Sequence, residues 1–456
     1  MNFEDTIAAI STAYGEGGIG IVRISGEKSL EILNKIFVCK GAIKNKYLTY
    51  GKIVDYRKGS TVDEVMAVYM KGPHTYTAED VVEINCHGSM VSLNKTLELI
   101  LASGARLAEP GEFTERAFFN GRLDLSQAEA VIDLIKAKTE KSFDVALSQL
   151  EGSVSSKVNE VLKLLLDIQV EIAVNIDYPD EDIEELTYNK LIGDTETAIS
   201  MVKKILEGAD AGRLIRDGLN VAIVGRPNVG KSSLLNCLLR ENRAIVTDIP
   251  GTTRDTIEET VNIRNIPVNL IDTAGIRETE DEIERIGIEK SKDAFNKADY
   301  VIMVVDGSEN LTDSDLELID YINSKKSMII INKADKESLI DFAHIKTISP
   351  NSDIVVAALI NGTGLDEIED IIESNVYGGK VSQGDSAMVN NVRHIDLLNR
   401  ALASLNSALN AAKMGSALDF AECDIRDAYD FLGEITGNTV SDDVINEVFS
   451  RFCLGK

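Results

Sequence analysis

The segment from Gly225 to Ser232 carries the residue types of a phosphate-binding loop. Gly225, Gly230, Lys231 and Ser232 occupy the fixed positions of the pattern G-x-x-x-x-G-K-[ST]. The glycines let backbone N–H groups surround a phosphate without a Cβ atom in the way, the lysine reaches the β- and γ-phosphates, and the serine hydroxyl is a ligand for Mg²⁺. The apolar run before the loop and the helical run after it argue against an ordinary glycine turn. The segment therefore predicts a nucleoside triphosphate site at the start of a helix.

Further motifs follow expected strands and indicate which base is bound. Asp272-Thr-Ala-Gly275 is suited to hold Mg²⁺ through water and to sense the γ-phosphate through a glycine N–H. The carboxylate of Asp335, in Asn332-Lys-Ala-Asp335, accepts from the ring N–H and the exocyclic amine of guanine, which adenine does not offer. Ala358, in Ala357-Ala-Leu359, offers a backbone N–H to the guanine carbonyl oxygen, although Ser-Ala is the more usual pair there. Together with the phosphate loop, these motifs predict a GTP-binding domain.

The residues that would drive hydrolysis differ from those of Ras. Ras-type enzymes place a glutamine after Asp-x-x-Gly to orient the attacking water, and this chain has Ile276 there. Glu284 is our candidate for that task because a carboxylate orders a water, and a solvated helix face is the alternative interpretation. No arginine that would enter the site is identifiable by pattern. The side-chain oxygen of Asn228 instead suggests a potassium ion against the phosphates, caged by the loop 247–253, with Thr253 as the second Mg²⁺ ligand.

The predicted GTP site thus combines a phosphate loop, a cation loop and the guanine motifs. Its predicted nucleotide contacts are Asn228, Val229, Gly230, Lys231, Ser232, Ser233, Thr247, Asp248, Ile249, Pro250, Gly251, Thr252, Thr253, Asp272, Thr273, Ala274, Gly275, Asn332, Lys333, Asp335 and Ala358. Its predicted metal ligands are Ser232 and Thr253 for Mg²⁺, and Asn228, Thr247, Ile249 and Thr252 for K⁺.

The composition bounds the class of protein. At 456 residues the chain is too long for one core and should form several domains. Its apolar runs, such as 301–305, are of strand length, so we expect no membrane span, and its acidic start lacks a secretory signal. Five cysteines without close pairing predict a reducing, cytoplasmic environment. The net charge of −28 argues against broad binding of nucleic acid by this chain alone, although a need for solubility explains it equally well.

The chain alternates between mixed and helical patterns. Residues 1–119 predict a mixed α/β region, with strands at 17–26, 64–70 and 80–85 and an amphipathic helix at 30–37. Helical periodicity follows and then resumes after the GTP motifs, most clearly at 123–135, 158–172, 191–208, 399–412 and 423–434. Helical sequence on both sides of the GTP motifs suggests that the GTP domain is inserted in a helical body.

A group of segments spread along the whole chain fits one known pattern. They are Gly225 to Ser233, Gly251-Thr-Thr-Arg-Asp255, Asp272-Thr-Ala-Gly275, Asp80 to Gly88, Pro110 to Leu125, and Phe452-Cys-Leu-Gly-Lys456. Taken together they resemble the bacterial tRNA-modification GTPase family (MnmE/TrmE) over the full length of the chain. The GTP motifs alone also fit ribosome-assembly GTPases, and the N-terminal block and the C-terminal end distinguish the two families.

The resemblance implies a fold of α/β and all-α parts. Residues 1–119 would form a mixed α/β domain that binds folate and dimerises. Residues 120–217 and 380–456 would form a helical domain, and residues 218–379 an inserted Ras-like P-loop GTPase domain. The resemblance also implies a homodimer whose GTP domains meet face to face when potassium and the transition state are present, with Glu284 as the residue that orients the water.

The function implied by the resemblance is tRNA modification by a GTP hydrolase that uses Mg²⁺ and K⁺. Members work with an FAD-containing partner protein, as a heterotetramer, to add an aminomethyl or carboxymethylaminomethyl group to carbon-5 of the wobble uridine in certain tRNAs. The one-carbon unit comes from a 5-formyl or 5,10-methylene tetrahydrofolate, and tRNA is contacted mainly through the partner. The alternative is a GTP-gated RNA or ribosome assembly factor without folate chemistry.

Carried over position by position, the implied folate contacts are Arg23, Glu83, Arg122 and Lys456. Arg122 stands where lysine is common, which keeps the charge but not the donor geometry. The Glu83 carboxylate suits pterin N–H groups, and the basic residues suit glutamyl carboxylates. Without the resemblance, Arg23 and Arg122 would be interpreted as ordinary surface charges. Cys453 is implied to lie near the folate, where a catalytic role is plausible, and would otherwise be interpreted as part of a frayed tail.

Overall fold

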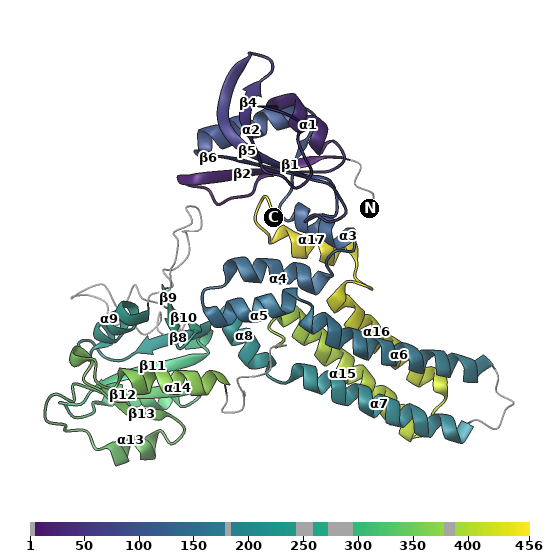
Figure 1. Ribbon diagram of the computed structural model, residues 1–456. Helices are drawn as coiled ribbons and strands as arrows, with labels where there is room; N and C mark the ends of the chain where they lie inside the picture. The colour runs from purple at the N-terminus through teal and green to yellow at the C-terminus, as the bar shows by residue number, and fades with distance from the viewer. Residues whose placement is uncertain (1–4, 178–183, 243–258, 272–294, 378–387) are drawn as a thin grey trace. The chain divides into compact units, whose positions relative to one another are not determined.

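The computed structural model of the chain describes residues 5–177, 184–242, 259–271, 295–377 and 388–456. The chain divides into two compact units, whose elements Figure 1 labels along the chain. The first unit comprises Met1–Ile132, Leu150–Leu166 and Ile425–Lys456, and the second comprises Asp133–Gln149 and Asp167–Asp424. Among the described helices, none has both the length and the apolar character that crossing a membrane requires.

A seven-stranded sheet forms the centre of the first unit. Its strands are β1 (Ile7–Ile10), β2 (Gly17–Ser25), β3 (Phe37–Cys39), β4 (Thr49–Asp55), β5 (Ser60–Met70), β6 (Val81–Gly88) and β7 (Arg106–Leu107). They lie in the order β3-β4-β5-β6-β2-β1-β7, and all neighbours are antiparallel except β1 and β7. The predicted strands correspond to β2, β5 and β6 and are confirmed. The register of β2 on β6 places Arg23 opposite Glu83.

Different helices cover the two faces of this sheet. Helices α1 (Ser29–Ile36) and α2 (Met90–Ala102) pack on one face. The core there includes Val22, Ile24, Ile32, Leu33, Val82, Ile84, Leu93 and Leu99. Helix α3 (Glu112–Phe119) packs near β1 on the other face, where Phe113 meets Ile7 and Ala9. Because the side chains of a strand alternate between faces, Arg23 and Glu83 lie on the α3 side of the sheet.

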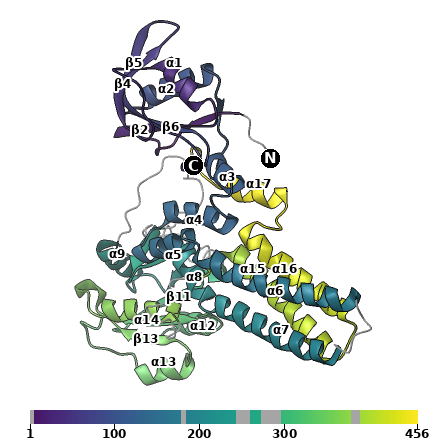
Figure 2. The same cartoon turned by 45° about the vertical axis from the view of Figure 1, so that its right-hand side comes forward.

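In the sequence, helices precede and follow the strands of a second sheet, which lies in the second unit. Those before it are α4 (Leu125–Lys136), α5 (Glu140–Leu150), α6 (Ser153–Asp177), α7 (Glu184–Leu206) and α8 (Ala209–Asp217), and those after it are α15 (Val392–Lys413), α16 (Leu418–Thr436) and α17 (Asp442–Ser450). Figures 1 and 2 both draw α7 and α15 side by side, and the two helices are in contact. Helical sequence from before and after the nucleotide motifs therefore packs together, as expected for an inserted domain.

A six-stranded, mostly parallel sheet forms the centre of the second unit. Its strands are β8 (Leu219–Val224), β9 (Glu259–Ile263), β10 (Ile266–Ile271), β11 (Tyr300–Asp306), β12 (Ser327–Asn332) and β13 (Asp353–Val356). They lie in the order β13-β12-β11-β8-β10-β9, and β9 alone is antiparallel to its neighbour. All residues of β11 and β12 are buried, which explains why they form continuous apolar runs in the sequence.

Helices cover both faces of the second sheet. Helices α9 (Lys231–Asn242) and α14 (Leu365–Tyr377) join the core on one face, and α12 (Asp313–Ile322) and α13 (Phe342–Ile348) join the core on the other. A parallel sheet covered by helices on both faces, with a glycine loop between its first strand and the following helix, is the fold of a P-loop domain. The predicted fold class, which combines mixed α/β, helical and P-loop parts, is confirmed.

Candidate functional site

The phosphate loop joins β8 to α9, as predicted. Gly225 has a φ of 145°, and a Cβ atom there would lie 2.4 Å from the carbonyl oxygen of Val304. Gly230 has a φ of 111°, and a Cβ atom there would lie 2.1 Å from Nδ2 of Asn332. Neither position tolerates a side chain, so the pattern's glycines are required by sterics as well as by ligand approach. The helix that follows begins with Lys231, Ser232 and Ser233.

Lys231 is held in the loop by neutral groups. Its Nζ donates to the carbonyl oxygens of Gly225 at 2.6 Å and of Arg226 at 2.7 Å. Burial of the ammonium lowers the pKa of Lys231. Arg226 itself pairs with Asp315 of α12 at 2.9 Å and with Glu309 at 3.4 Å. Because a charged acceptor binds an ammonium more strongly than a carbonyl does, Lys231 is poised to exchange its carbonyl partners for phosphate oxygens.

The lowered pKa of Lys231 predicts a pH dependence of GTP binding. Only the ammonium form attracts phosphate, so affinity should fall as the pH rises through a pKa that lies below the ordinary lysine value of 10.5. Bound phosphates raise this pKa again, so binding on the alkaline side should take up protons. Calorimetric titration in buffers of different ionisation enthalpy measures this uptake. Lys231→Arg stays charged throughout, so it should show only the uptake that comes from the guanine ring N–H, which also ionises at alkaline pH. Proton uptake that is equal in the wild type and in Lys231→Arg would contradict the prediction.

Asn332 links the predicted motifs to one another. Its Nδ2 donates to the carbonyl oxygen of Val229 at 2.9 Å, and its Oδ1 accepts from the N–H of Leu359 at 3.1 Å. The next residue, Lys333, has a φ of 66°, and its Nζ lies 2.5 Å from Oδ2 of Asp306. These contacts hold the loops after β8, β11, β12 and β13 together. They therefore lie at the carboxyl edge of the sheet, which is where open α/β sheets bind ligands.

The two residues predicted to recognise guanine differ in exposure. Asp335 is exposed, so its carboxylate is open to a base. Ala358 is buried, and its N–H donates to the carbonyl oxygen of Thr363 at 3.1 Å. The N–H that the sequence analysis assigned to the guanine carbonyl oxygen is therefore bonded within its own loop. A guanine contact at Ala358 requires that N–H to be shared or released, and it stays a prediction.

Part of the predicted GTP site lies outside the described residues. These are the cation loop, the motif after β10 and the candidate water-orienting residue, namely Thr247, Asp248, Ile249, Pro250, Gly251, Thr252, Thr253, Asp272, Thr273, Ala274, Gly275 and Glu284. Asn228 is described, with a φ of 64° and an exposed side chain. No described residue forms a hydrogen bond with that side chain, which suits a ligand for a cation. In the described part of the chain, no three or more His, Cys, Asp or Glu side chains form a metal-binding group.

The structure brings the predicted folate residues together on the α3 side of the first sheet. Arg23 donates from Nε to Oε1 of Glu83 at 2.9 Å. The guanidinium carbon of Arg122 lies 4.9 Å from the centre of the Tyr76 ring, and that of Arg23 lies 5.2 Å from the same ring. Burial and the neighbouring Arg23 lower the pKa of Lys456, although Glu83 opposes them. Cationic side chains therefore outnumber the carboxylate of Glu83, and the cluster suits an anionic ligand that also carries N–H donors.

The C-terminal tail is docked beside this cluster. Ser11 donates to the carbonyl oxygen of Gly455 at 3.0 Å. Gly455 has a φ of 88°, and a Cβ atom there would lie 2.2 Å from a backbone carbonyl oxygen of β1. Leu454 packs against the small core formed by Ile7, Ala9, Ala108 and Phe113. Cys453 is exposed and lies close enough to influence Lys456 electrostatically. The tail is therefore packed in place and not frayed, and this places Cys453 near the predicted folate residues.

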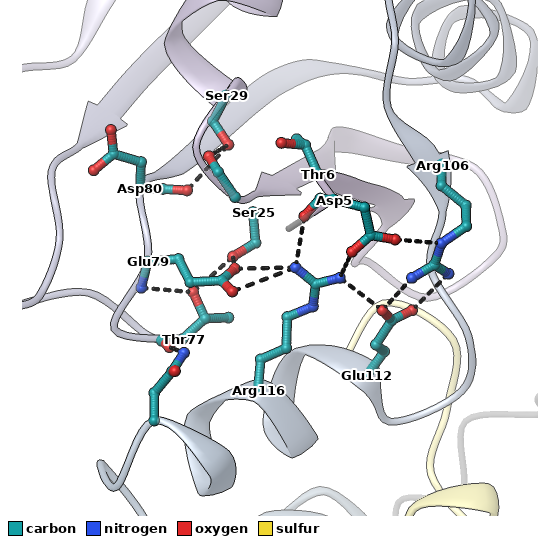
Figure 3. Close-up of polar contacts among 12 residues, drawn as sticks. Asp5, Thr6, Ser25, Ser29, Thr77, Glu79, Asp80, Arg106, Glu112 and Arg116 are labelled. Atoms are coloured by element: carbon teal, nitrogen blue, oxygen red, sulfur yellow. Dashed lines mark hydrogen bonds and ion pairs between the residues drawn. The ribbon is translucent and has the colours of Figure 1, made fainter. Parts of the chain in front are cut away.

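A buried arginine that no sequence motif marks anchors α3 (Figure 3). Arg116 is fully buried, and its Nη2 lies 2.6 Å from Asp5 and 2.9 Å from Glu112. Its Nη1 lies 3.3 Å from both carboxylate oxygens of Glu79, and Arg106 also pairs with Glu112 at 2.5 Å. Asp5 is 111 positions and Glu79 is 37 positions away from Arg116 in the sequence, so no local pattern marks the network. Tyr76 was missed for the same reason.

Comparisons with known proteins agree with these features. The family model described as "GTP-binding protein TrmE N-terminus" matches residues 6–122, and the one described as "MnmE helical domain" matches residues 125–453. The "tRNA modification GTPase MnmE" of Alkaliphilus metalliredigens (strain QYMF) is 53% identical over 461 residues, and that of Clostridioides difficile (strain 630) is 49% identical over 461 residues. Each match covers 100% of this chain and 100% of the relative.

Among solved structures, the G domain of the T. maritima FeoB iron transporter covers 34% of this chain and 98% of that chain, with 26% identity and a TM-score of 0.25. The fold of the second unit is established by its own strand order and phosphate loop, not by this likeness. Both relatives are about half identical to this chain over their full length, and both are described as tRNA modification GTPases. The chain belongs to the MnmE/TrmE family of tRNA modification GTPases and is a GTP-hydrolysing enzyme.

Proposed function

We propose that this chain is a potassium-dependent GTPase that, with an FAD-containing partner, installs an aminomethyl or carboxymethylaminomethyl group at carbon-5 of the wobble uridine of certain tRNAs. The one-carbon donor is a 5-formyl or 5,10-methylene tetrahydrofolate. The convergence of Arg23, Glu83, Arg122 and Lys456 on one side of the first sheet carries the proposal. Such a cluster suits a ligand with carboxylates at one end and pterin N–H groups at the other, whereas a GTP-gated assembly factor has no use for it.

The proposed architecture follows the sequence motifs. Residues 1–119 bind folate and dimerise, residues 120–217 with 380–456 form the helical domain, and residues 218–379 form the GTPase domain. The chain works as a cytoplasmic homodimer that joins its partner in a heterotetramer. Its net charge of −28 supports contact with tRNA mainly through that partner, because a strongly acidic chain repels a phosphate backbone.

The proposed catalytic groups surround the GTP phosphates. Ser232 and Thr253 bind Mg²⁺, and Asn228 binds K⁺ together with Thr247, Ile249 and Thr252. The exposed Asn228 side chain supports this role. The ions supply positive charge to the transition state, and Glu284 orients the attacking water. Arg226 is already paired with Asp315 and Glu309, which supports the use of a cation in place of an arginine. Cys453 is the proposed catalytic residue beside the folate site.

Potassium dependence is the first test of this chemistry. GTP hydrolysis should be at least about tenfold faster in KCl than in NaCl at equal ionic strength, because a preorganised cation stabilises the developing charge. Asn228→Ala should remove the difference between the two salts. Asn236→Ala, an exposed asparagine on α9, is the matched control and should keep it. Equal wild-type rates in the two salts would remove potassium from the proposal.

Equilibrium dialysis with 5-formyltetrahydrofolate tests the folate site and separates the two functions. The wild-type chain should bind the ligand, and Arg23→Ala should weaken binding by at least about tenfold, because a hydrogen bond to a charged group contributes about 1.5–3 kcal/mol. Arg57→Ala removes a half-exposed arginine that pairs with Asp55 in the same domain, and it should leave binding unchanged. No binding by the wild type, or binding that Arg23→Ala leaves intact, would favour the assembly factor.

A further inference from the structure

Tyr76 lies at the centre of the folate cluster, although no sequence motif marks it. Its ring is contacted by two guanidinium groups, that of Arg122 at 4.9 Å and that of Arg23 at 5.2 Å from the ring centre. We propose that Tyr76 is the positioning residue of this site, and that it holds the Arg122 guanidinium ready to bind a carboxylate of the ligand. This inference rests on the proposed folate function and adds a residue to it.

The two guanidinium groups differ in what else holds them. Arg23 is fixed independently of Tyr76, by Glu83 at 2.9 Å and by the carbonyl oxygen of Gly455 at 3.4 Å. Arg122 is exposed, and among the residues that the structure describes it has no ion-pair partner. Within the described part of the chain, its guanidinium forms no hydrogen bond and lies over the Tyr76 ring. A cation over an aromatic face keeps its full charge and its N–H donors, so Arg122 remains able to bind an anion.

Hydrogen bonds hold the segment that follows Tyr76, which makes this segment suitable for positioning (Figure 3). Thr77 shares a hydrogen bond of 2.6 Å with Ser25, and its carbonyl oxygen accepts from Asn120 at 2.7 Å. Glu79 accepts from Ser25 at 2.7 Å and from the buried Arg116 at 3.3 Å. Ser25 of β2, Arg116 of α3 and Asn120, which directly follows α3, therefore hold the segment immediately after Tyr76. A group fixed in this way binds its ligand without losing further conformational freedom.

The ring of Tyr76 is also fixed directly. Its hydroxyl shares a hydrogen bond of 2.8 Å with Thr114 of α3, which is fully buried. The ring packs against the small core that contains Phe113 and Ala9, beside Leu454 of the docked tail. Tyr76 thus joins the sheet, α3 and the C-terminal tail at the point where the cations converge.

The test compares variants of Tyr76 in the full-length protein by dialysis with 5-formyltetrahydrofolate. Tyr76→Leu should raise the dissociation constant about tenfold, because it removes aromatic contacts to two cations. Tyr76→Phe keeps the ring and loses only the Thr114 hydrogen bond, so its dissociation constant should stay close to that of the wild type. Tyr56→Leu is the matched control, because it removes a ring 4.6 Å from the ammonium of Lys35 elsewhere in the same domain, and it should not change binding.

A double-mutant cycle shows whether Tyr76 acts through Arg122. If it does, the combined Tyr76→Leu and Arg122→Ala variant should lose at least about threefold less affinity than the product of the two single losses. A double loss equal to that product would overturn the inference, and so would Tyr76→Leu binding that matches the wild type. Binding by Tyr76→Phe as weak as that by Tyr76→Leu would also overturn the inference, because the loss would then follow the Thr114 hydrogen bond and not the aromatic ring.

A readout without ligand separates this inference from the proposed function. The rate at which phenylglyoxal modifies Arg122, followed by peptide mass spectrometry, reports how firmly the guanidinium is held. Tyr76→Leu should raise this rate by at least about threefold, and Tyr76→Phe and Tyr56→Leu should not. A wild type that fails to bind folate would contradict the proposed function alone. An Arg122 modification rate unaffected by Tyr76→Leu would overturn the positioning role of Tyr76, whatever the ligand.

Discussion

Replacing Asp335 with asparagine should convert the enzyme from a GTPase to one that prefers xanthosine triphosphate. The carboxylate of Asp335 is exposed at the carboxyl edge of the sheet. We propose that it accepts from the ring N–H and the amine of guanine. An asparagine amide offers a donor where guanine also offers one, so a polar pair is left unmade. Xanthine carries a carbonyl oxygen in place of the amine and accepts from that amide. Because leaving a buried polar group unpaired discriminates by about 10⁴-fold, kcat/KM for GTP should fall by about 10³–10⁴-fold.

Steady-state kinetics with both nucleotides measure this change of preference. Asp320→Asn removes the same charge from an exposed position on α12 and should leave kcat/KM for GTP near its wild-type value. An Asp335→Asn variant that still prefers GTP would show that the base is recognised elsewhere. The contact of Lys333 with Asp306, at 2.5 Å, does not involve Asp335, so the substitution should leave the neighbouring Lys333 in place.

Replacing Arg116 with methionine should destabilise the first unit by about 3–5 kcal/mol, the usual cost of removing one partner from a buried ion pair. Arg116 is fully buried, and its removal leaves the carboxylate of Glu79 without its ion-pair partner and that of Glu112 with Arg106 alone. The stability of Arg116→Lys should fall between those of the wild type and Arg116→Met, because a single ammonium does not reach partners on both sides of a guanidinium. Urea unfolding followed by hydrogen exchange in α3 measures the loss. Arg451→Met breaks an exposed pair with Glu447 and should cost about 0.5 kcal/mol or less.

The same network predicts how stability changes with pH. Burial raises the pKa of Glu112, but hydrogen bonds from Arg106, from the Glu109 N–H and from Arg116 outweigh it, so the pKa lies below its usual value. A carboxylate with a lowered pKa stabilises the fold above its unfolded pKa, and this stabilisation is lost as the pH falls through the folded pKa. Wild-type stability should therefore drop as the pH falls below about 4, with a steeper slope than in Arg116→Met. Equal slopes in the two proteins would contradict this role of the network.

The GTP motifs were predictable from the sequence because their chemistry is local. Gly225, Gly230 and Lys231 lie in one short loop, and sterics restrict the two glycines as chemistry restricts the lysine. Asp335 follows a strand that is buried on both faces and so forms an apolar run. The prediction for Ala358 was less complete, because pairing of its N–H with Thr363 depends on the conformation of the loop between them.

The first unit shows what local patterns leave out. Arg23 and Glu83 are 60 positions apart and come together through the register of β2 on β6. Only the resemblance to a family marked them, since an isolated arginine on a strand has the pattern of a surface charge. The contacts of Tyr76 and Arg116 depend on tertiary packing of the loop before β6 against α3, and no spacing rule along the chain predicts such packing.

Mass analysis of wobble nucleosides in tRNA tests the central claim most directly. Cells that lack this protein should contain unmodified uridine where wild-type cells carry the 5-aminomethyl or 5-carboxymethylaminomethyl group. Expression of the wild-type chain should restore the modification, and expression of Lys231→Ala or Arg23→Ala should not, because the first disrupts GTP binding and the second the folate cluster. Wobble uridines that stay modified in cells without the protein would contradict the account.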